Sequence, residues 1–575
     1  MEKRVLLAVV LSFIVVWGFQ VAFPPPRPDR PEQPVSSDPA PGPRPADAPP
    51  QAEAPPPAVA APVEPPAAEA LVADTEAREI VVENGHVRAT FSTRGGVLTS
   101  WQLRQYFTDD GRPLDIVPER APADAPRPFS LTVEDPAVNS RLADALFKPD
   151  VESLETSTSP ATLTFEYRDA AGVGARKVFG FTPERPYVIE FSAEVTTPAG
   201  PLNPTVNWGP ALGTGVVPSG LMYSQSPQPI FYRDGEVNRI DFASVPEYRV
   251  MENQAGFAGV DDHYFLTALL PTATPVGVQY EQTPVITGPE GTLHFVSWAV
   301  RFAGPPAGAT FFAGPKDFDV LAAVDRDLVR AIHFGIFSPI VVPLLRALKW
   351  VNGYAGNYGW SIVILTVIIN LVIFPLRHKS VVSMRKMQEL QPEVKAIQDR
   401  YAKLKMSDPA RSKMNVELMN LYRERGANPA SGCVPMLLTL PVLFSFYSML
   451  SVAIELRGAP FILWIRDLSV YDPWFVTPVV MGATQFIQTK LTPATADPAQ
   501  QRIMLLMPLI FMTMFIWAPS GLVLYWTVSN MWAIGQQVVT NKLIGPPPQR
   551  SVRPPAERRV KSAGGGRSEG AKERK

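Results

Sequence analysis

The chain has 575 residues, which leaves room for more than one domain, and its formal net charge of −1 hides a strong asymmetry. Residues 24–354 carry 25 Lys and Arg against 40 Asp and Glu, whereas residues 377–425 carry 12 against 6 and residues 542–575 carry 10 against 3. The single cysteine, Cys433, excludes an intramolecular disulfide, and we expect it to be a small buried packing residue.

The N-terminal segment contains Lys3 and Arg4, followed by an apolar run over residues 5–23. This run is close to the roughly 20 residues that a helix needs to cross a bilayer. No convincing small-residue cleavage site follows it, so we expect residues 1–23 to be a transmembrane anchor rather than a cleaved signal peptide. Residues 24–76 are dense in Pro and Ala, which predicts an extended linker without a core of its own.

Residues 77–324 change character and are predicted to form an all-β domain. Apolar and polar residues alternate in short runs that Gly and Pro interrupt, at 79–84, 87–92, 161–167, 187–195 and 293–302. Many short strands with little helix predict a large β-sandwich. Asp261, Asp262 and His263 have side chains that suit a metal, but a triplet of this kind is more typical of a solvated turn.

Residues 325–357 switch to a helical period. Apolar side chains recur at spacings of three and four residues, which predicts an amphipathic helix that Pro339 and Pro343 kink or break. Because a hydrophobic segment follows directly, we expect this helix to lie on the outer membrane surface. The alternative is a helix that packs only on the β-domain.

Five hydrophobic stretches follow, and we expect each to cross the membrane: 359–377, 433–453, 473–490, 503–518 and 520–541. Cytoplasmic loops are enriched in Lys and Arg, so both basic segments, and with them both termini, are predicted to be cytoplasmic. The β-domain then lies on the opposite side. Residues 542–575 form a basic tail that is predicted to be disordered; it sets the orientation, attracts anionic lipid or ribosomal RNA, or does both.

Residues 378–428 are polar but periodic and predict a helical hairpin in the cytoplasm. Met384, Met387, Leu390 and Met414 belong to its apolar stripes. The stripes are more typical of a seam between the two helices, although a contact surface for substrates or partners is the alternative.

Polar side chains interrupt several of the predicted spans. Thr366 and Asn370 share a helix face, as do Gln485 and Gln488, and the last span contains Tyr525, Trp526 and Asn530. Such groups need partners or water inside a membrane. Interhelical hydrogen bonds explain each one singly, whereas polar faces in several spans together favour a wet internal cavity. Without a nucleotide-binding loop or a catalytic nucleophile, we expect neither an enzyme nor a cofactor.

The order of short motifs in residues 358–541 resembles the YidC family of membrane protein insertases. The matching segments are Tyr358–Ser361, Phe374–Leu376, Leu390–Pro392, Asn428–Pro435, Pro441 with Phe446 and Tyr447, Asp472–Pro473 and Pro519–Asn530. The linker, the β-rich region and Gly314–Lys316 resemble the long form of this family. The resemblance implies a periplasmic β-supersandwich and a helical bundle of five conserved transmembrane helices, preceded by the N-terminal anchor, in the bacterial inner membrane.

The resemblance also implies a mechanism. A polar groove open to cytoplasm and lipid receives the polar part of a nascent membrane protein, while its hydrophobic segment enters the lipid. The implied partners are nascent membrane proteins, the Sec translocon (SecYEG and SecDF), membrane lipids, and the ribosome through the tail and hairpin. The family usually has an arginine at the position of Asn370, so we expect a nearly neutral groove here. The competing hypotheses are a transporter or channel and a membrane-anchored periplasmic binding module.

Overall fold

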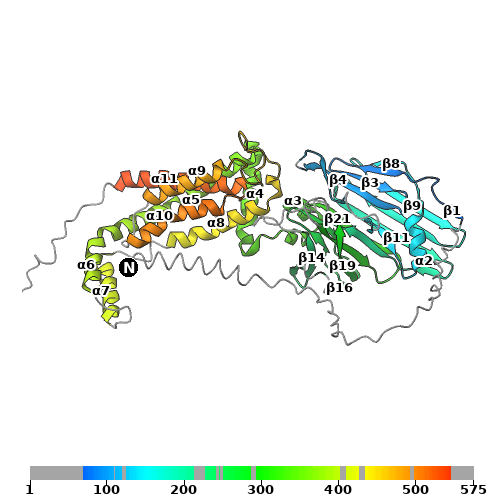
Figure 1. Cartoon of the computed structure of the whole chain (residues 1–575), viewed down its shortest axis with the longest axis horizontal. Helices are drawn as coiled ribbons and strands as arrows, with labels where there is room; N and C mark the ends of the chain where they lie inside the picture. The colour runs from blue at the N-terminus through cyan, green and yellow to red at the C-terminus, as the bar shows by residue number, and fades with distance from the viewer. Residues whose placement is uncertain are drawn as a thin grey trace, which may run out of the picture. The chain divides into compact units, whose positions relative to one another are not determined.

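The computed structural model describes residues 69–108, 110–118, 125–212, 227–240, 245, 250–285, 293–401, 410–426, 434–491 and 498–544. The chain forms two compact units, a strand-rich one that ends at His333 and a helical one that starts at Phe334 (Figure 1). The expected anchor at residues 1–23, most of the expected linker, Cys433 and the tail beyond residue 544 lie outside the described residues.

The strand-rich unit contains three sheets in its described part (Figure 1). The largest runs in the order β1 (Ala70–Val72), β9 (Ala161–Asp169), β10 (Gly174–Phe181), β11 (Val188–Thr197), β21 (Ala307–Pro315), β18 (Phe265–Leu269), β17 (Ala258–Asp261), β14 (Gln228–Arg233) and β15 (Glu236–Arg239), with β12 (Gly200–Leu202) beside β11 and β7 (Lys148–Pro149) beside β9. The second runs β16 (Val250–Gln254), β19 (Val276–Val285), β20 (Leu293–Arg301), β13 (Thr205–Pro210) and β6 (Ser130–Thr132). The third runs β5 (Pro113–Asp115), β4 (Val97–Phe107), β3 (Val87–Ser92), β2 (Glu79–Glu83) and β8 (Ser153–Glu155).

These sheets confirm the sheet-rich prediction, and β2, β3, β9, β11 and β20 coincide with the five alternating runs. The described part of this unit also contains two short α-helices, α2 (Pro136–Asp144) and α3 (Phe318–Val324), and a 3₁₀ helix at Leu328–Ala331. The predicted linker ends too late, because β1 belongs to the folded unit. This strand pairs antiparallel with β9, so contacts to residues almost 100 positions away hold it, and local composition does not reveal them.

An aromatic core joins the sheets. Phe129 lies at its centre, with ring centroids 5.2 Å from Phe179 of β10, 5.3 Å from Phe311 of β21 and 5.3 Å from Trp208 of β13. The third sheet joins the same core through Phe91 of β3, whose ring lies 4.8 Å from Phe179. All five side chains are almost fully buried, and the burial of such large rings is the main stabilising contribution to the packed sheets.

Lys177 of β10 is buried within the same unit, with 1% of its surface exposed. Its Nζ donates to the backbone carbonyls of Gly95, Gly96 and Phe129 at 2.6, 3.1 and 2.8 Å. Gly95 and Gly96 have positive φ angles of 73° and 55°, a conformation that glycine adopts without strain. Burial lowers the pKa of the Lys177 amine to about 7, because the interior disfavours its charged form.

We expect the strand-rich unit to become more stable as pH rises from about 7 to 10. In the unfolded chain a lysine has a pKa of about 10.4, so in this window the unfolded state binds more protons than the folded state. Each pKa unit of difference corresponds to about 1.4 kcal/mol. Urea unfolding at several pH values, followed by the fluorescence of the buried tryptophans, would measure how the free energy of unfolding changes with pH. The Lys177→Met variant should have a lower free energy of unfolding, and that free energy should rise less with pH than it does in the wild-type chain. An equal rise with pH in both proteins would contradict the lowered pKa of Lys177.

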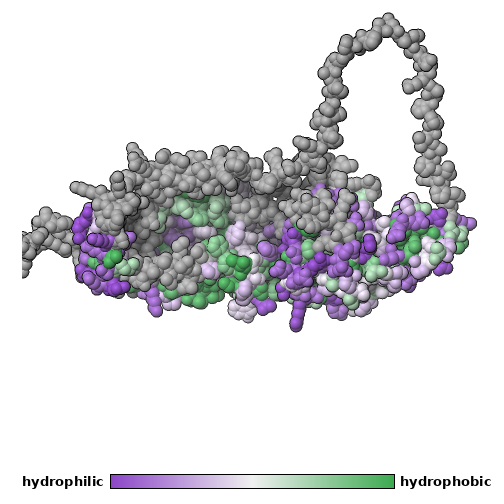
Figure 2. Space-filling model, turned by 90° about the horizontal axis from the view of Figure 1, so that it is seen from below, coloured by the Kyte–Doolittle hydropathy of each residue, from purple (hydrophilic) through white to green (hydrophobic). Residues whose placement is uncertain are grey.

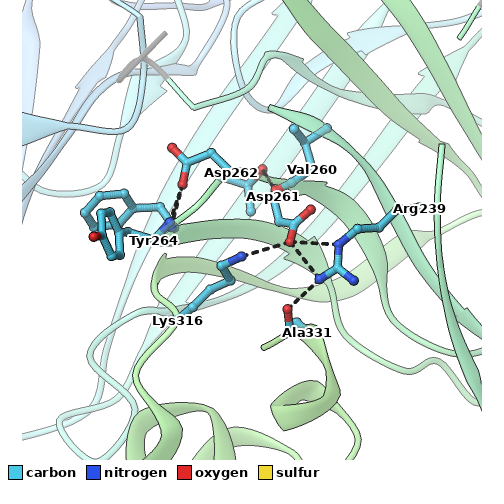
Figure 3. A network of polar contacts seen from close by, with 9 residues as sticks. Arg239, Val260, Asp261, Asp262, Tyr264, Lys316 and Ala331 are labelled. Atoms are coloured by element: carbon cyan, nitrogen blue, oxygen red, sulfur yellow. Dashed lines mark hydrogen bonds and ion pairs between the residues drawn. The ribbon is translucent and has the colours of Figure 1, made fainter. Parts of the chain in front are cut away.

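Asp261 and Asp262 form structural contacts rather than a solvated turn (Figure 3). Asp261 Oδ2 accepts from Arg239 Nη2 and Lys316 Nζ, each at 3.0 Å, and Asp261 has no exposed surface. Asp262 Oδ1 accepts from the backbone N–H of Tyr264 and closes the turn before β18. The expectation of a solvated turn was therefore wrong for both aspartates, because Asp261 at the end of β17 and Asp262 in the turn that follows are both buried. Within the described residues, no group of three His, Cys, Asp or Glu side chains is arranged to hold a metal.

The helical unit consists of α4 (Ser338–Ala355), α5 (Tyr358–Glu389), α6 (Gln391–Tyr401), α7 (Ala410–Glu424), α8 (Val434–Val452), α9 (Val476–Leu491), α10 (Pro498–Met514) and α11 (Ser520–Ile544). Each of the five hydrophobic stretches predicted between residues 359 and 541 overlaps one of the helices α5, α8, α9, α10 and α11. In the described part, one segment is long and apolar enough by itself to cross a membrane, Tyr358–Lys379 of α5; Pro441–Val452 and Met504–Met514 are shorter apolar segments. Figure 2 shows hydrophobic side chains gathered over this unit, and α5, α9 and α10 all contribute exposed large apolar residues.

Helix α4 carries the amphipathic pattern expected for residues 325–357. Val341, Leu345, Leu348 and Val351 are buried, whereas Trp350 and Tyr354 are exposed. Pro339 lies in the first turn, where its missing N–H is not needed, and the helix continues past Pro343. Of the two outcomes predicted for these prolines, a kink or a break, the structure therefore excludes the break.

Candidate functional site

Thr366 and Asn370 lie one turn apart on α5, as their spacing predicts, and both are buried. Thr366 Oγ1 donates to the carbonyl of Ile362 at 2.6 Å, and Asn370 Nδ2 donates to the carbonyl of Thr366 at 2.8 Å. Side-chain bonds to the carbonyl one turn earlier satisfy polar atoms within the helix itself. The donors of both residues therefore have partners without a contact to another helix.

Arg377 provides the acceptor of Asn370 with a charged partner. Its Nη1 donates to Asn370 Oδ1 at 3.1 Å, from a position two helical turns further along α5. Helix α5 packs against α11, and the Arg377 side chain lies near enough to Tyr525 of α11 for an electrostatic interaction. The expectation of a nearly neutral site therefore needs correction, because the positive charge that is missing at position 370 reaches the same amide from position 377.

Tyr525 and Trp526 point to different neighbours although they are adjacent in sequence. The ring of Tyr525 stacks on Phe446 of α8, with centroids 4.4 Å apart and planes 7° apart. Trp526 instead packs against α10, 5.5 Å from Phe511 and 5.1 Å from Phe515. Tyr525 thus belongs to the group around Arg377, whereas Trp526 belongs to an aromatic contact between α10 and α11.

A second polar group joins α9 to α11. Asn530 Nδ2 donates to Thr484 Oγ1 at 3.3 Å and to the carbonyl of Met481 at 3.4 Å. These are interhelical hydrogen bonds, which the sequence analysis gave as the alternative to a wet cavity. Gln485, one residue after Thr484, has a buried Oε1 without a donor among the described residues. Gln488 is half-buried and has a polar contact of its own. Both glutamines therefore remain candidates for the polar groove, and they differ in that Gln488 has a polar contact whereas the Gln485 oxygen has no donor among the described residues.

Comparison with known proteins identifies the family. A model of the 60Kd inner membrane protein matches residues 350–546, and a model of the YidC periplasmic domain matches residues 79–347. The chain is 35% identical to the membrane protein insertase YidC of Geobacter metallireducens, over 95% of this chain and 99% of that protein. The corresponding protein of Oleidesulfovibrio alaskensis is 35% identical over 93% of this chain and 98% of its own length. The chain belongs to the YidC family of membrane protein insertases.

A crystal structure of an active YidC insertase with its first transmembrane domain resolved also matches the chain. It is 21% identical, covers 82% of this chain and 95% of its own, and has a TM-score of 0.33. The family assignment rests on the sequence relatives, which match this chain over nearly its full length.

The residues predicted as a possible contact surface on the helical hairpin have different environments in the structure. Leu390 is buried with Val394 between α6 and α7, against Leu418, Leu421 and Tyr422. Ion pairs from Arg400 to Glu417 and from Arg425 to Glu393 hold the two helices together. Leu390 is thus part of the seam, the interpretation that the periodicity favoured, and is not exposed for a partner. Met414 is half-buried, and the side chains of Met384 and Met387 lie outside the described residues.

The hairpin also begins later than the predicted boundary at residue 378. Helix α5 continues without interruption to Glu389, and α6 begins at Gln391 with Pro392 in its first turn. A proline there cannot continue the preceding helix but fits the start of a new one. The apolar stripe that contains Met384, Met387 and Leu390 therefore begins on α5 and continues onto α6 rather than lying on one hairpin helix.

Arg377 is the functional candidate that the sequence analysis missed. The signal was present, because residues seven apart on a helix lie on nearly the same face. It was overlooked because Arg377 lies at the end of the apolar run, where a basic residue is usually read as a topology signal. A long arginine side chain reaches back over such a distance along an apolar surface.

Proposed function

We propose that this chain inserts nascent integral membrane proteins into the bacterial inner membrane and assists their folding, alone or with the Sec translocon. The sequence relatives, named as membrane protein insertases, support this activity. The observation that carries the mechanism is the group of Asn370, Arg377 and Tyr525, a charge-bearing polar site among helices whose outer faces are apolar.

The proposed role of this group follows from the cost of moving polar residues through hydrocarbon. A peptide amide or hydroxyl without a partner in an apolar environment costs several kcal/mol. A polar groove that extends into the membrane shortens the path over which the translocated part of a substrate lacks partners. The hydrophobic segment of the substrate then leaves sideways into lipid, where its burial is favourable.

Arg377 supplies charge selectivity in this proposal. Its guanidinium attracts acidic residues in the translocated part of a substrate, and the low dielectric constant around it strengthens that attraction. Asn370 holds the guanidinium in place through its side-chain oxygen. The arrangement thus reproduces with two residues what the family usually achieves with one arginine at position 370.

The proposed topology has six spans, with the strand-rich unit in the periplasm and both termini in the cytoplasm. The charge asymmetry supports it, since residues 24–354 are acidic and the two basic segments fall on the other side. The exposed aromatic side chains of α4 support a position on the periplasmic membrane surface. The hairpin and the basic tail are the proposed contacts for the ribosome and for anionic lipid.

Depletion of this protein in its host should stop insertion of a small single-span membrane protein. We expect the substrate to remain accessible to protease from the cytoplasm, since the step that carries its polar end across the bilayer is lost. Protease protection after pulse labelling measures this directly. Expression of the full chain should restore protection, and normal insertion after depletion would show that the proposed function is wrong.

Arg377→Gln should slow insertion of substrates with acidic translocated tails by roughly 10- to 100-fold, because a charge-assisted contact contributes about 1.5–3 kcal/mol. Insertion of matched substrates with neutral tails should change little. Arg377→Lys, which keeps the charge, is the control. The same protease-protection assay compares all variants.

A relocated charge provides the sharper test. The double variant Asn370→Arg with Arg377→Gln should recover insertion of the acidic-tailed substrate, since the charge returns to the same site from the other position. Asn370→Leu should impair both kinds of substrate, because it removes a polar side chain from the proposed groove as well as the acceptor that positions Arg377. If the double variant is no better than Arg377→Gln alone, Arg377 does not act through this site.

A further inference from the structure

The segment that joins α8 to α9, residues 457–475, is described in full and contains no helix or strand. Unstructured loops longer than roughly 12–15 residues are usually either disordered or functional. This one is packed: Ile465 and Leu468 are buried, and Asp472 has only 1% of its surface exposed. In the topology proposed above, the segment lies at the periplasmic end of the bundle, and we call it the outer loop.

The start of α11 holds the outer loop through backbone hydrogen bonds. The first N–H groups of a helix have no partner within that helix, so an acceptor must come from elsewhere. The N–H of Ser520 donates to the carbonyl of Val470 at 2.8 Å, and the N–H of Gly521 donates to the carbonyl of Leu468 at 2.9 Å. Both acceptors belong to the outer loop, so the contacts that satisfy the start of α11 also fix the loop on it.

The start of α5 holds the loop through its capping residue. Asn357 Oδ1 accepts from the backbone N–H of Trp360 at 3.1 Å. Asn357 Nδ2 donates to the loop carbonyls of Pro460 and Phe461, at 3.0 and 3.2 Å. The ring of Phe461 occupies the space that a side chain at Gly359 would need. The loop therefore lies directly on the first turn of α5.

Asp472 connects the loop to the start of α9. Its Oδ1 accepts from the backbone N–H of Trp474 at 2.9 Å, and its Oδ2 accepts from the backbone N–H of Thr477 at 2.8 Å. A carboxylate is favourable at this end of a helix, where N–H groups lack partners. Its Oδ1 also accepts from Trp464 Nε1 at 2.9 Å, from the middle of the loop. One buried carboxylate thus fastens the loop to the first turn of α9.

An apolar layer lies next to the outer loop, between α5 and α11. A Cβ atom built on Gly521 would lie 3.4 Å from the Ile362 side chain of α5 and 3.6 Å from that of Leu456, which directly precedes the loop. Ile362 and Leu456 have no exposed surface. Asn370 lies eight residues after Ile362, which is about 12 Å along the helix. The layer therefore separates the polar group around Arg377 from the outer end of the bundle.

We propose that the outer loop is a seal that keeps periplasmic water and ions away from the polar group around Arg377, and that Asp472 is the positioning residue that holds the seal closed. This role rests on the proposed function, in which the polar group belongs to a groove open to the cytoplasm. With the outer end open, water would reach the same group from both sides and ions could cross the membrane. An apolar constriction prevents this, because water and ions lose their polar partners there.

The test measures proton flux with the full chain in vesicles of phosphatidylethanolamine and phosphatidylglycerol that contain a pH-sensitive dye. Asp472→Ala should raise the flux roughly 10- to 100-fold, because losing hydrogen bonds to a charged group increases the fraction of released loop by about that factor. Trp464→Phe keeps the ring and loses only its N–H, so it should leak less. Asp467→Ala is the matched control and should not leak, since among the described residues Asp467 accepts only from Ser469 of the same loop.

Leu456→Ala tests the apolar layer with the contacts of Asp472 left intact. It removes side-chain volume from the layer and should also raise the flux. Vesicles that stay tight with both Asp472→Ala and Leu456→Ala would overturn the proposal. A leak through Asp467→Ala as large as that through Asp472→Ala would overturn the specific role of Asp472.

Insertion of a single-span substrate by the same variants separates the possible failures. Asp472→Ala should still insert the substrate while it leaks. A variant that leaks and no longer inserts would show that Asp472 supports the whole bundle rather than the seal. If the wild-type chain inserts no substrate but both variants leak, the proposed function fails and the seal stands. If the wild-type chain inserts and neither variant leaks, the seal fails alone.

Discussion

The requirement that buried polar groups find partners governs the helical unit. Asn370 would be costly on an isolated apolar helix, but its amide donates to the preceding turn and its oxygen accepts from Arg377. This one interaction brings a positive charge into an apolar bundle and fixes its position. The proposed insertase mechanism depends on it, because without a held charge the same helices offer only hydrogen bonds.

The strand-rich unit satisfies the same requirement in a different way. Here the interior is dominated by aromatic rings from three sheets, and the few buried charges are enclosed by specific partners. Lys177 is held by three backbone carbonyls, and Asp261 is held by two cations. Removing a partner of Asp261 leaves an uncompensated charge, and removing the Lys177 amine leaves three carbonyls without their donor, so these residues are constraints on the fold rather than sites of chemistry.

The two polar groups and an apolar groove divide the bundle by chemistry. The group around Arg377 joins α5, α8 and α11, and the group around Asn530 joins α9 and α11. The apolar groove lies between α5 and α11. Helix α11 thus contributes to every site, which agrees with the dense run of motif residues at its start, Pro519–Asn530.

The sequence by itself determined the elements whose signals are local. Alternation predicted the strands, the spacing of apolar residues predicted α4 and the hairpin seam, and apolar length predicted the helices of the bundle. These patterns are readable because each depends on residues within one or two turns or along one strand. Only the tertiary structure decided the partners of Lys177 and Asp261, the addition of β1 to the large sheet and the different directions of Tyr525 and Trp526. Those features depend on contacts between residues that are far apart in the chain, and no local period records such contacts. Asn370 with Arg377 stands between the two cases, since the spacing was visible but only the folded side chains linked the charge to the amide.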